Sequence, residues 1–167
     1  SPADVRVIAP RVAGAITGGV LFPVDAHVQP ARLVAELARL AIARGARIQT
    51  GHEVLALSRE GRRVTRVRTT RGDFATREVV IAGGAWSPQI SGALGLRLPV
   101  QGAKGYSITV RCPSDFGEPP IMLSEWQVFI TPMGELLRFG GTLELAGLDV
   151  SVNLRRVRAV ERAVARV

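Results

Sequence analysis

The chain has little cysteine, histidine or aromatic residue, and each shortage excludes a class of function. Its only cysteine, Cys112, cannot form an internal disulfide, and one thiol does not make a cysteine-based metal site. The two histidines, His27 and His52, have no partners at metal-ligand spacing, so no metal site is expected. Aromatic residues make up 5% of the chain, which is too few to stack nucleic-acid bases along a surface.

The formal net charge of +8 comes almost entirely from arginine, since Lys104 is the only lysine. The arginines are scattered and form no basic tract interleaved with aromatics, so nucleic acid is not an expected partner. Weak attraction to an anionic membrane surface or to an electron acceptor fits this charge better. No apolar run approaches the ~20 residues of a membrane span. We therefore expect a cytoplasmic protein, with peripheral contact to the inner face of the cell membrane left open.

Apolar residues make up 47% of the chain, enough for a real core, and their spacing predicts the helices. A helix is expected over residues 31–44, with Gly45 as its left-handed cap. A short helix is expected over 88–94, and an amphipathic helix from Leu154 to the C-terminus. Strands are expected over 13–22, 47–50, 53–58, 64–70, 74–82, 100–110, 121–124, 126–131 and 136–145.

The stretch from Val79 to Ser87 is the most informative of these segments. Three branched apolar residues predict a buried strand, which runs into Gly83-Gly84 and then Trp86. Such a strand end brings bare main chain close to a phosphate or a flat cofactor. The alternative is a core strand followed by a glycine-rich turn. No hydrolytic set of side chains is present, so any chemistry has to come from a cofactor.

Three motifs together resemble those of a known family. They are Val79–Ser87, the run Lys104-Gly105-Tyr106-Ser107-Ile108-Thr109, and the run Arg138-Phe139-Gly140-Gly141-Thr142-Leu143-Glu144 followed by Gly147. In this order they resemble the D-amino acid oxidase-like family of FAD-dependent oxidoreductases, and more strongly its bacterial D-amino acid dehydrogenase small subunits. The resemblance covers nearly the whole chain. It implies FAD as cofactor and an amino acid substrate, with hydride removal from a D-amino acid to give a 2-oxo acid.

The resemblance also implies roles for individual residues. Those implied to contact FAD are Val54 at the adenine, Gly83, Gly84 and Trp86 along the pyrophosphate and ribityl chain, and Gly140 and Gly141 at the ring. Lys104, Gly105 and Tyr106 are implied to approach the flavin ring or the substrate cavity, and Arg138 the substrate carboxylate. Two residues have simpler alternatives. Arg138 can be a solvated or salt-bridged strand residue, and Tyr106 a core aromatic with its hydroxyl satisfied.

The sequence departs from the family at the phosphate anchor, because no Gly-x-Gly-x-x-Gly spacing occurs in it. The family's closing segment is also missing. We therefore expect a fragment that binds FAD weakly or not at all and is inactive without the remainder of its parent polypeptide. Two alternatives are a non-catalytic stand-alone binding or subunit-interface module, and a family member acting on glycine, sarcosine or proline.

The predicted fold class is α+β. A mixed or antiparallel substrate-domain sheet with helices is expected beside an incomplete, Rossmann-like part of an FAD-binding domain. Residues 1–28 and 96–167 are assigned to the substrate-binding domain. Residues 29–95 are assigned to the middle part of the FAD-binding domain.

Overall fold

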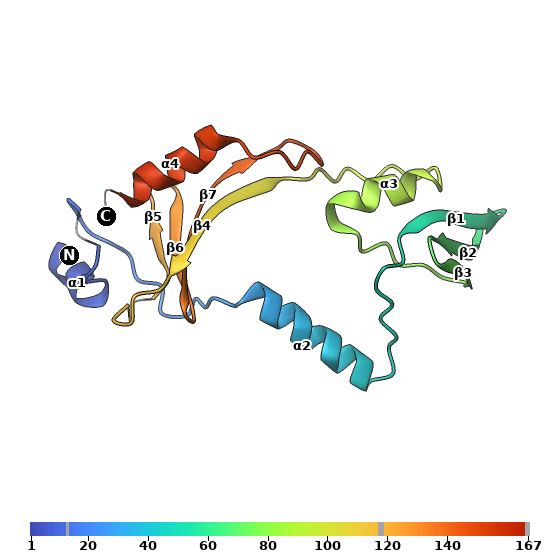
Figure 1. Cartoon of the computed structure of the whole chain (residues 1–167), viewed down its shortest axis with the longest axis horizontal. Helices are drawn as coiled ribbons and strands as arrows, with labels where there is room; N and C mark the ends of the chain where they lie inside the picture. The colour runs from blue at the N-terminus through green and yellow to red at the C-terminus, as the bar shows by residue number, and fades with distance from the viewer. Residues whose placement is uncertain (13, 117–118, 166–167) are drawn as a thin grey trace. The chain divides into compact units, whose positions relative to one another are not determined.

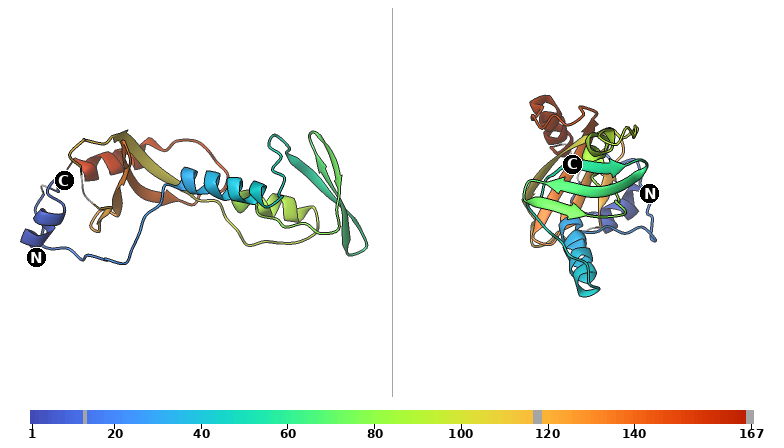
Figure 2. Two further views of the ribbon diagram at one scale, coloured as in Figure 1. Left: turned by 90° about the horizontal axis from the view of Figure 1, so that it is seen from below. Right: turned by 90° about the vertical axis from the view of Figure 1, so that its right-hand side faces the viewer.

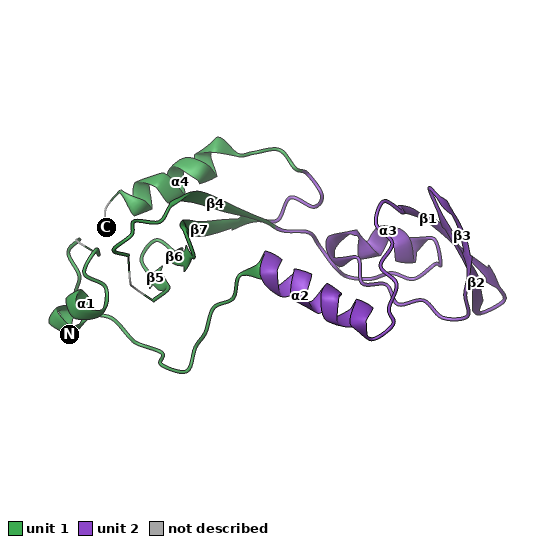
Figure 3. Cartoon of the chain, turned by 60° about the horizontal axis from the view of Figure 1, so that its bottom comes forward, with its two compact units in different colours: residues 1–30, 104–144, 150–167 green, residues 31–103, 145–149 purple. Residues whose placement is uncertain are grey.

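A computed structural model describes the chain apart from residues 13, 117–118 and 166–167. The chain folds into two compact units (Figure 3). Unit 1 comprises Ser1–Pro30, Lys104–Glu144 and Val150–Val167, and unit 2 comprises Ala31–Ala103 and Leu145–Asp149. The assignment of these stretches to substrate and FAD domains stays a prediction.

Unit 1 is built on a four-stranded antiparallel sheet in the order β4-β7-β6-β5 (Figure 1). Its strands are β4 (Lys104–Arg111), β5 (Ile121–Leu123), β6 (Val128–Met133) and β7 (Leu136–Glu144). Two helices belong to the unit, α1 (Pro2–Ile8) and α4 (Leu154–Val164). The tight connection between β6 and β7 uses Gly134 at φ 69°, a backbone conformation that glycine adopts without strain.

Helix α4 lies along one face of this sheet (Figure 2), and the core of unit 1 forms between them. The helix begins after Asn153, whose side chain accepts a hydrogen bond from the backbone N–H of Arg155 and so caps the first turn. Val160 is 1% exposed and lies at the centre of the contact. The buried core consists of Leu123, Val128, Ile130, Leu137, Val160 and Ala163. Because side chains alternate along a strand, the residues between these point to the opposite face of the sheet.

Unit 2 contains a three-stranded antiparallel meander in the order β1-β2-β3. Its strands are β1 (Val54–Glu60), β2 (Arg63–Thr69) and β3 (Gly72–Ala75). Its helical elements are α2 (Pro30–Ala43), the 3₁₀ turn η1 (Gly84–Trp86) and α3 (Ser87–Gly92), and α3 packs against β1. Gly61 and Gly72 close the two hairpins with positive φ angles.

The α+β class is confirmed, and so are the elements with the strongest local patterns. Helix α2 follows the predicted apolar spacing and ends at Gly45, which has φ 91°. The meander, α3, the β6–β7 hairpin and α4 also form close to their predicted bounds. The apolar residues whose helical spacing predicts the C-terminal helix, Leu154, Val157, Val160 and Val164, all lie in α4, and the fifth, Val167, falls outside the described residues. Helix α1 was not predicted, although Ser1 and Asp4 form a capping box at its start.

Several predicted strands are wrong. Residues 14–22, 47–50 and 79–82 are not assigned to any strand, while Ala13 lies outside the described residues. Strand β3 ends at Ala75, and β4 begins at Lys104 rather than at residue 100. An extended segment becomes a strand only when a neighbour receives its backbone hydrogen bonds. Among the described residues, no strand pairs with these three segments.

Helix α2 shows a related mismatch between pattern and burial. Its apolar side chains lie at helical spacing, as in a helix that packs against a core. None of its residues is buried, and Val34 and Leu37 are 64% and 57% exposed. The apolar face of α2 is therefore not covered by the described part of the chain.

Gly102 supplies a test of the packing within unit 2. A Cβ atom at this buried position would lie 2.6 Å from the carbonyl oxygen of Gly147, which is backbone and cannot swing aside. We expect Gly102→Ala to lower the free energy of unfolding by about 1–3 kcal/mol, as other overpacked sites do. Thermal unfolding measures the change.

The matched control is Gly92→Ala in α3, where an added Cβ meets nothing within 4 Å. This variant should leave the stability unchanged or slightly higher, because alanine is the better helix former. Equal stability of the two variants would show that Gly102 and Gly147 are not packed as described.

Candidate functional site

The face of the unit 1 sheet opposite α4 carries a compact set of polar and small residues. We call it the open face and define it by Ser107, Thr109, Phe129, Arg138 and Gly140. The strand register places Gly140 between Ser107 on β4 and Phe129 on β6. It also places Arg138 between Thr109 and Thr131. Directly opposed residues on neighbouring strands have Cβ atoms about 5 Å apart, so the two rows form one continuous surface.

Arg138 provides the positive charge on the open face. Its side chain is exposed, and its Nε donates a hydrogen bond to Thr109 Oγ1 at 3.4 Å. Within the described residues, no carboxylate lies at ion-pair distance from this guanidinium. A guanidinium offers several N–H donors in a fixed plane, so Arg138 has donors available for an anion.

The two adjacent glycines of β7 serve different purposes. A Cβ at Gly140 would meet nothing within 4 Å, so the main chain there is bare on the open face. A Cβ at Gly141 would lie 2.8 Å from Val128 Cγ2 and 3.4 Å from Val160 Cγ2. Gly141 therefore allows β7 to approach β6 and α4 closely. Of the pair, the open face presents Gly140, whereas Gly141 lies between the sheet and the helix.

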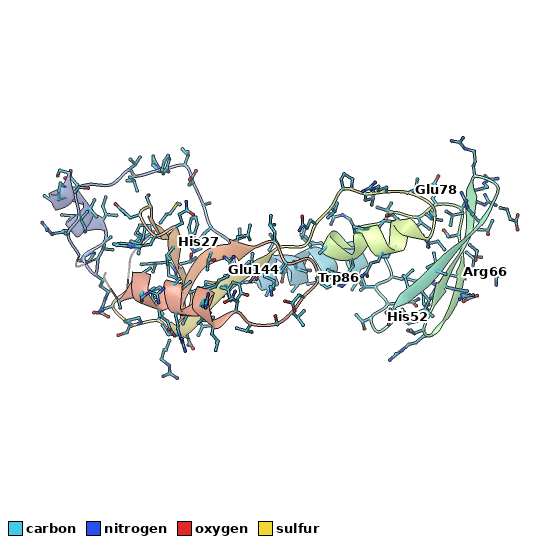
Figure 4. All side chains as sticks on the ribbon, turned by 90° about the horizontal axis from the view of Figure 1, so that it is seen from above. His27, His52, Arg66, Glu78, Trp86 and Glu144 are labelled. Atoms are coloured by element: carbon cyan, nitrogen blue, oxygen red, sulfur yellow. The ribbon has the colours of Figure 1, made fainter. Side chains whose placement is uncertain are left out.

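Lys104 and Tyr106 lie on the α4 face, where they join a polar cluster around Glu144. We call this cluster the Glu144 network; it consists of Lys104, Tyr106, Glu144, Asn153 and Arg156. Glu144 ends β7 (labelled in Figure 4) and its Oε2 accepts a hydrogen bond from the Tyr106 hydroxyl at 2.5 Å. The same oxygen lies 3.4 Å from Arg156 Nε and 3.8 Å from Lys104 Nζ.

The network ties the start of α4 to two strands. The Tyr106 hydroxyl, which donates to Glu144, also accepts a hydrogen bond from the backbone N–H of Asn153 at 3.2 Å. Lys104 Nζ donates to the carbonyl oxygen of Ser151 at 2.8 Å. The Tyr106 side chain is thus a core aromatic with its hydroxyl satisfied, as one of the two sequence interpretations expected. Its contact with flavin or substrate stays a prediction.

The pKa of Glu144 is lowered from its ordinary value, because its charged form is stabilised from several sides. The hydrogen bond from Tyr106 is the largest cause, and the positive charges of Lys104 and Arg156 act in the same direction. Partial burial opposes them, because it disfavours a charge. Glu144 is therefore ionised at neutral pH and accepts hydrogen bonds rather than donating them.

The other residues implied to contact FAD belong to unit 2. Val54 opens β1 opposite Thr69. Gly84 has φ 53°, and a Cβ there would meet nothing within 4 Å, whereas one at Gly83 would touch the Ile90 side chain at 3.4 Å. Trp86 ends η1 and is 57% exposed (Figure 4). The structure thus places Val54, Gly83, Gly84 and Trp86 in one unit and the remaining candidates in the other.

Sequence reasoning did not assign a role to Glu144, Asn153 or Arg156. The one available signal was Glu144 itself, which closes the Arg-x-Gly-Gly-x-x-Glu motif. Arg138 and Glu144 are an even number of residues apart, so an uninterrupted strand would place both on one face. In the structure they lie on opposite faces, because the register of β7 against β4 shifts between the two residues.

The sheet of unit 1 thus has one face covered by α4 and one bare face that carries a cation. Comparison with known proteins identifies its class: the family model described as FAD dependent oxidoreductase matches residues 1–167. The chain therefore belongs to this family, known as DAO. Expectations of an oxidoreductase family and of D-amino acid dehydrogenase relatives are both confirmed.

Individual relatives agree with this result. The chain is 34% identical over 165 residues to a D-amino acid dehydrogenase of Paramagnetospirillum magneticum, an alignment covering 96% of this chain and 39% of that protein. The chain thus spans about two-fifths of the length of this relative. Among solved structures, L-proline dehydrogenase from P. horikoshii covers all of this chain with a TM-score of 0.86. This match involves 46% of that protein at 20% identity, and it supports the fold alone.

A second solved structure is more similar in sequence. Glycine oxidase from Geobacillus kaustophilus is 29% identical, with a TM-score of 0.70, over 81% of this chain and 36% of that protein.

Among the described residues, no helix is both long and apolar enough to cross a membrane.

The lowered pKa of Glu144 predicts how stability depends on pH. Its stabilising effect is complete above the unfolded-chain pKa of about 4.3 and is lost as pH falls through the lower folded-state pKa. Glu144→Gln should therefore flatten the loss of thermal stability between about pH 5 and pH 3, since glutamine does not titrate. Thermal melts across this range measure the effect.

Asp115→Asn is a suitable comparison, because Arg11 lowers the pKa of Asp115 at a different place in unit 1. A Glu144→Gln profile parallel to that of the wild type would show that Glu144 is not held ionised by its neighbours.

Proposed function

We propose that the protein containing this chain oxidises D-amino acids to 2-oxo acids, with FAD as the hydride acceptor. The observation that carries the proposal is Arg138, a guanidinium without a described carboxylate partner, beside the bare main chain of Gly140. The relatives named D-amino acid dehydrogenase, at 31–39% identity, support the substrate class.

The residues present fit a planar cofactor in part. Gly140 lacks a side chain on the open face, and Gly105 on β4 lacks one too; a Cβ at either would meet nothing within 4 Å, so bare main chain is accessible there. We assign Gly140 to the flavin ring, and Val54, Gly83, Gly84 and Trp86 to the rest of FAD. The role of Gly141 is indirect, since it allows β7 to pack against α4. When bound, FAD would accept the hydride that leaves the substrate α-carbon.

The chain's own residues would bind and orient the substrate. The Arg138 guanidinium would hold the α-carboxylate, and its hydrogen bond to Thr109 limits how far the guanidinium can swing. Phe129 is 50% exposed next to Gly140 and offers an apolar wall for the substrate side chain. A substrate held by its carboxylate at one end and by its side chain at the other would present one face of its α-carbon for reaction.

The further partners we propose are the remainder of the parent polypeptide and an electron acceptor. We place the protein in the cytoplasm, with the acceptor reached at the inner face of the membrane. A net charge of +8 would favour approach to an anionic surface.

A second candidate function is oxidation of glycine, sarcosine or proline. It is favoured by the 29% identity to a glycine oxidase, and the same Arg138 would bind any of these carboxylates. The substrates of the two candidate functions differ in the groups attached to the α-carbon and to the amino nitrogen.

A substrate panel separates these functions. We expect the protein, loaded with FAD, to reduce an artificial electron-accepting dye with D-amino acids such as D-alanine and D-phenylalanine. The L-enantiomers should give no reduction, because binding of the carboxylate and side chain fixes which face of the α-carbon is presented. Reduction with glycine, sarcosine or L-proline alone would support the second function. No reduction with any of them, by protein that retains FAD, would support a non-catalytic module.

Arg138→Gln tests the assigned carboxylate contact. Loss of a charged hydrogen-bonding partner should raise KM for the amino acid by about 10–100-fold, corresponding to about 1.5–3 kcal/mol. The FAD content should not change. Arg158→Gln, at an exposed position of α4 on the other face of the sheet, is the matched control and should leave KM unchanged. Equal KM values for the two variants would remove Arg138 from the site.

A further inference from the structure

We propose that Glu144 is a positioning residue: with Arg156 it holds a strained bulge at Thr142, and the bulge fixes where Gly140 and Arg138 lie along the open face. The inference rests on the proposed function, since it concerns the site that Arg138 and Gly140 form. Its structural part is independent of the substrate.

The bulge interrupts the pairing of β4 with β7. Tyr106 is opposite Gly141 and Gly105 is opposite Leu143, so Thr142 has no partner on β4. Thr142 has φ 57°, which is the left-handed region that glycine normally supplies in bulges of this kind. For a β-branched residue this conformation is a genuine outlier and is strained. It persists only where surrounding contacts hold it.

Arg156 and Glu144 provide these contacts. Arg156 Nη1 donates to Thr142 Oγ1 at 2.6 Å and to the carbonyl oxygen of Leu143 at 3.0 Å. Its Nε lies 3.4 Å from Glu144 Oε2, so Glu144 orients the guanidinium that binds the bulge. The Thr142 side chain and the carbonyl group of the next residue are thereby fixed to α4.

The bulge also explains the position of Glu144. One extra residue in a strand exchanges the faces of all residues that follow it. Without the bulge, Glu144 would share the face of Arg138 and Gly140. With it, Glu144 turns to the α4 face, where Tyr106 and Lys104 meet its carboxylate. The bulge and the Glu144 network are therefore mutually dependent.

The functional consequence lies in the residues of β7 that precede the bulge, Gly140 and Arg138. Residues 136–141 pair with β4 on one side and β6 on the other, and Leu137 faces the core, so they keep their faces if the bulge relaxes. Relaxation would turn residues 143–144 and pull Gly140 and Arg138 along the open face. The Glu144 network therefore fixes the position of Arg138 without touching the substrate.

The experiment uses the FAD-loaded protein at full length and three variants. Glu144→Gln removes the charge that orients Arg156 and should raise KM for a D-amino acid about tenfold, with a smaller change in kcat. Thr142→Gly supplies a residue that adopts φ 57° without strain and should keep KM near that of the wild type. The double variant should also stay near wild type, because a glycine bulge does not need to be held.

This rescue separates positioning from a general loss of stability. If Glu144 only stabilises the fold, Thr142→Gly will not restore KM in the double variant, and that result would overturn the proposal. Asp115→Asn is the control for loss of an ion pair elsewhere in unit 1, and its KM should be that of the wild type. Thermal unfolding of each variant shows that the measured protein is folded.

Backbone hydrogen exchange gives a second readout that does not depend on turnover. Glu144→Gln should increase exchange of the amides in residues 138–143, and addition of Thr142→Gly should restore their protection. If the wild type oxidises no amino acid in the panel but exchange follows this pattern, the proposed function fails and the bulge-holding role stands. Unchanged exchange in Glu144→Gln would overturn that role whatever the activity.

Discussion

The pairing of β4 with β7 is the interaction on which unit 1 depends, because it decides which residues face α4 and which face outward. Side chains alternate along each strand, so one register fixes two surfaces at once. Leu137 and Gly141 face the helix, while Arg138 and Gly140 form the open face. A packed core and a bare outer surface are thus the two sides of one set of hydrogen bonds.

The sequence predicted the elements whose stability is local and missed those that need a partner. Helix α2, with its cap at Gly45, and the β6–β7 hairpin follow from spacing and turn residues. Residues 79–82 have the composition of a buried strand but are not paired with any described strand. The exposed apolar face of α2 has the same cause. An apolar pattern shows that a segment is suited to burial, but it does not show which segment covers it. The chain spans 39% of the length of its Paramagnetospirillum relative.

The candidate site was predictable only as far as strand alternation holds. Motif and alternation together place Arg138 and Gly140 on one surface, and the structure has them there. The position of Glu144 could not be derived in this way, because an unpaired Thr142 reverses the alternation. Nothing in the local sequence marks Thr142, since bulges with positive φ ordinarily use glycine. The signal is tertiary, and it consists of the hydrogen bonds from Arg156 in α4.

The same reasoning separates the cations of unit 1 by role. Lys104, on the α4 face of the sheet, and Arg156, in α4 itself, share the carboxylate of Glu144, so their charges are compensated within the fold. Arg138 faces the other way; its guanidinium hydrogen-bonds to the neutral hydroxyl of Thr109, and no described carboxylate lies at ion-pair distance from it. Residue type and strand propensity do not distinguish a structural arginine from a binding one. The face of the sheet does, since it decides whether an acid of the chain or an anion from outside meets the charge.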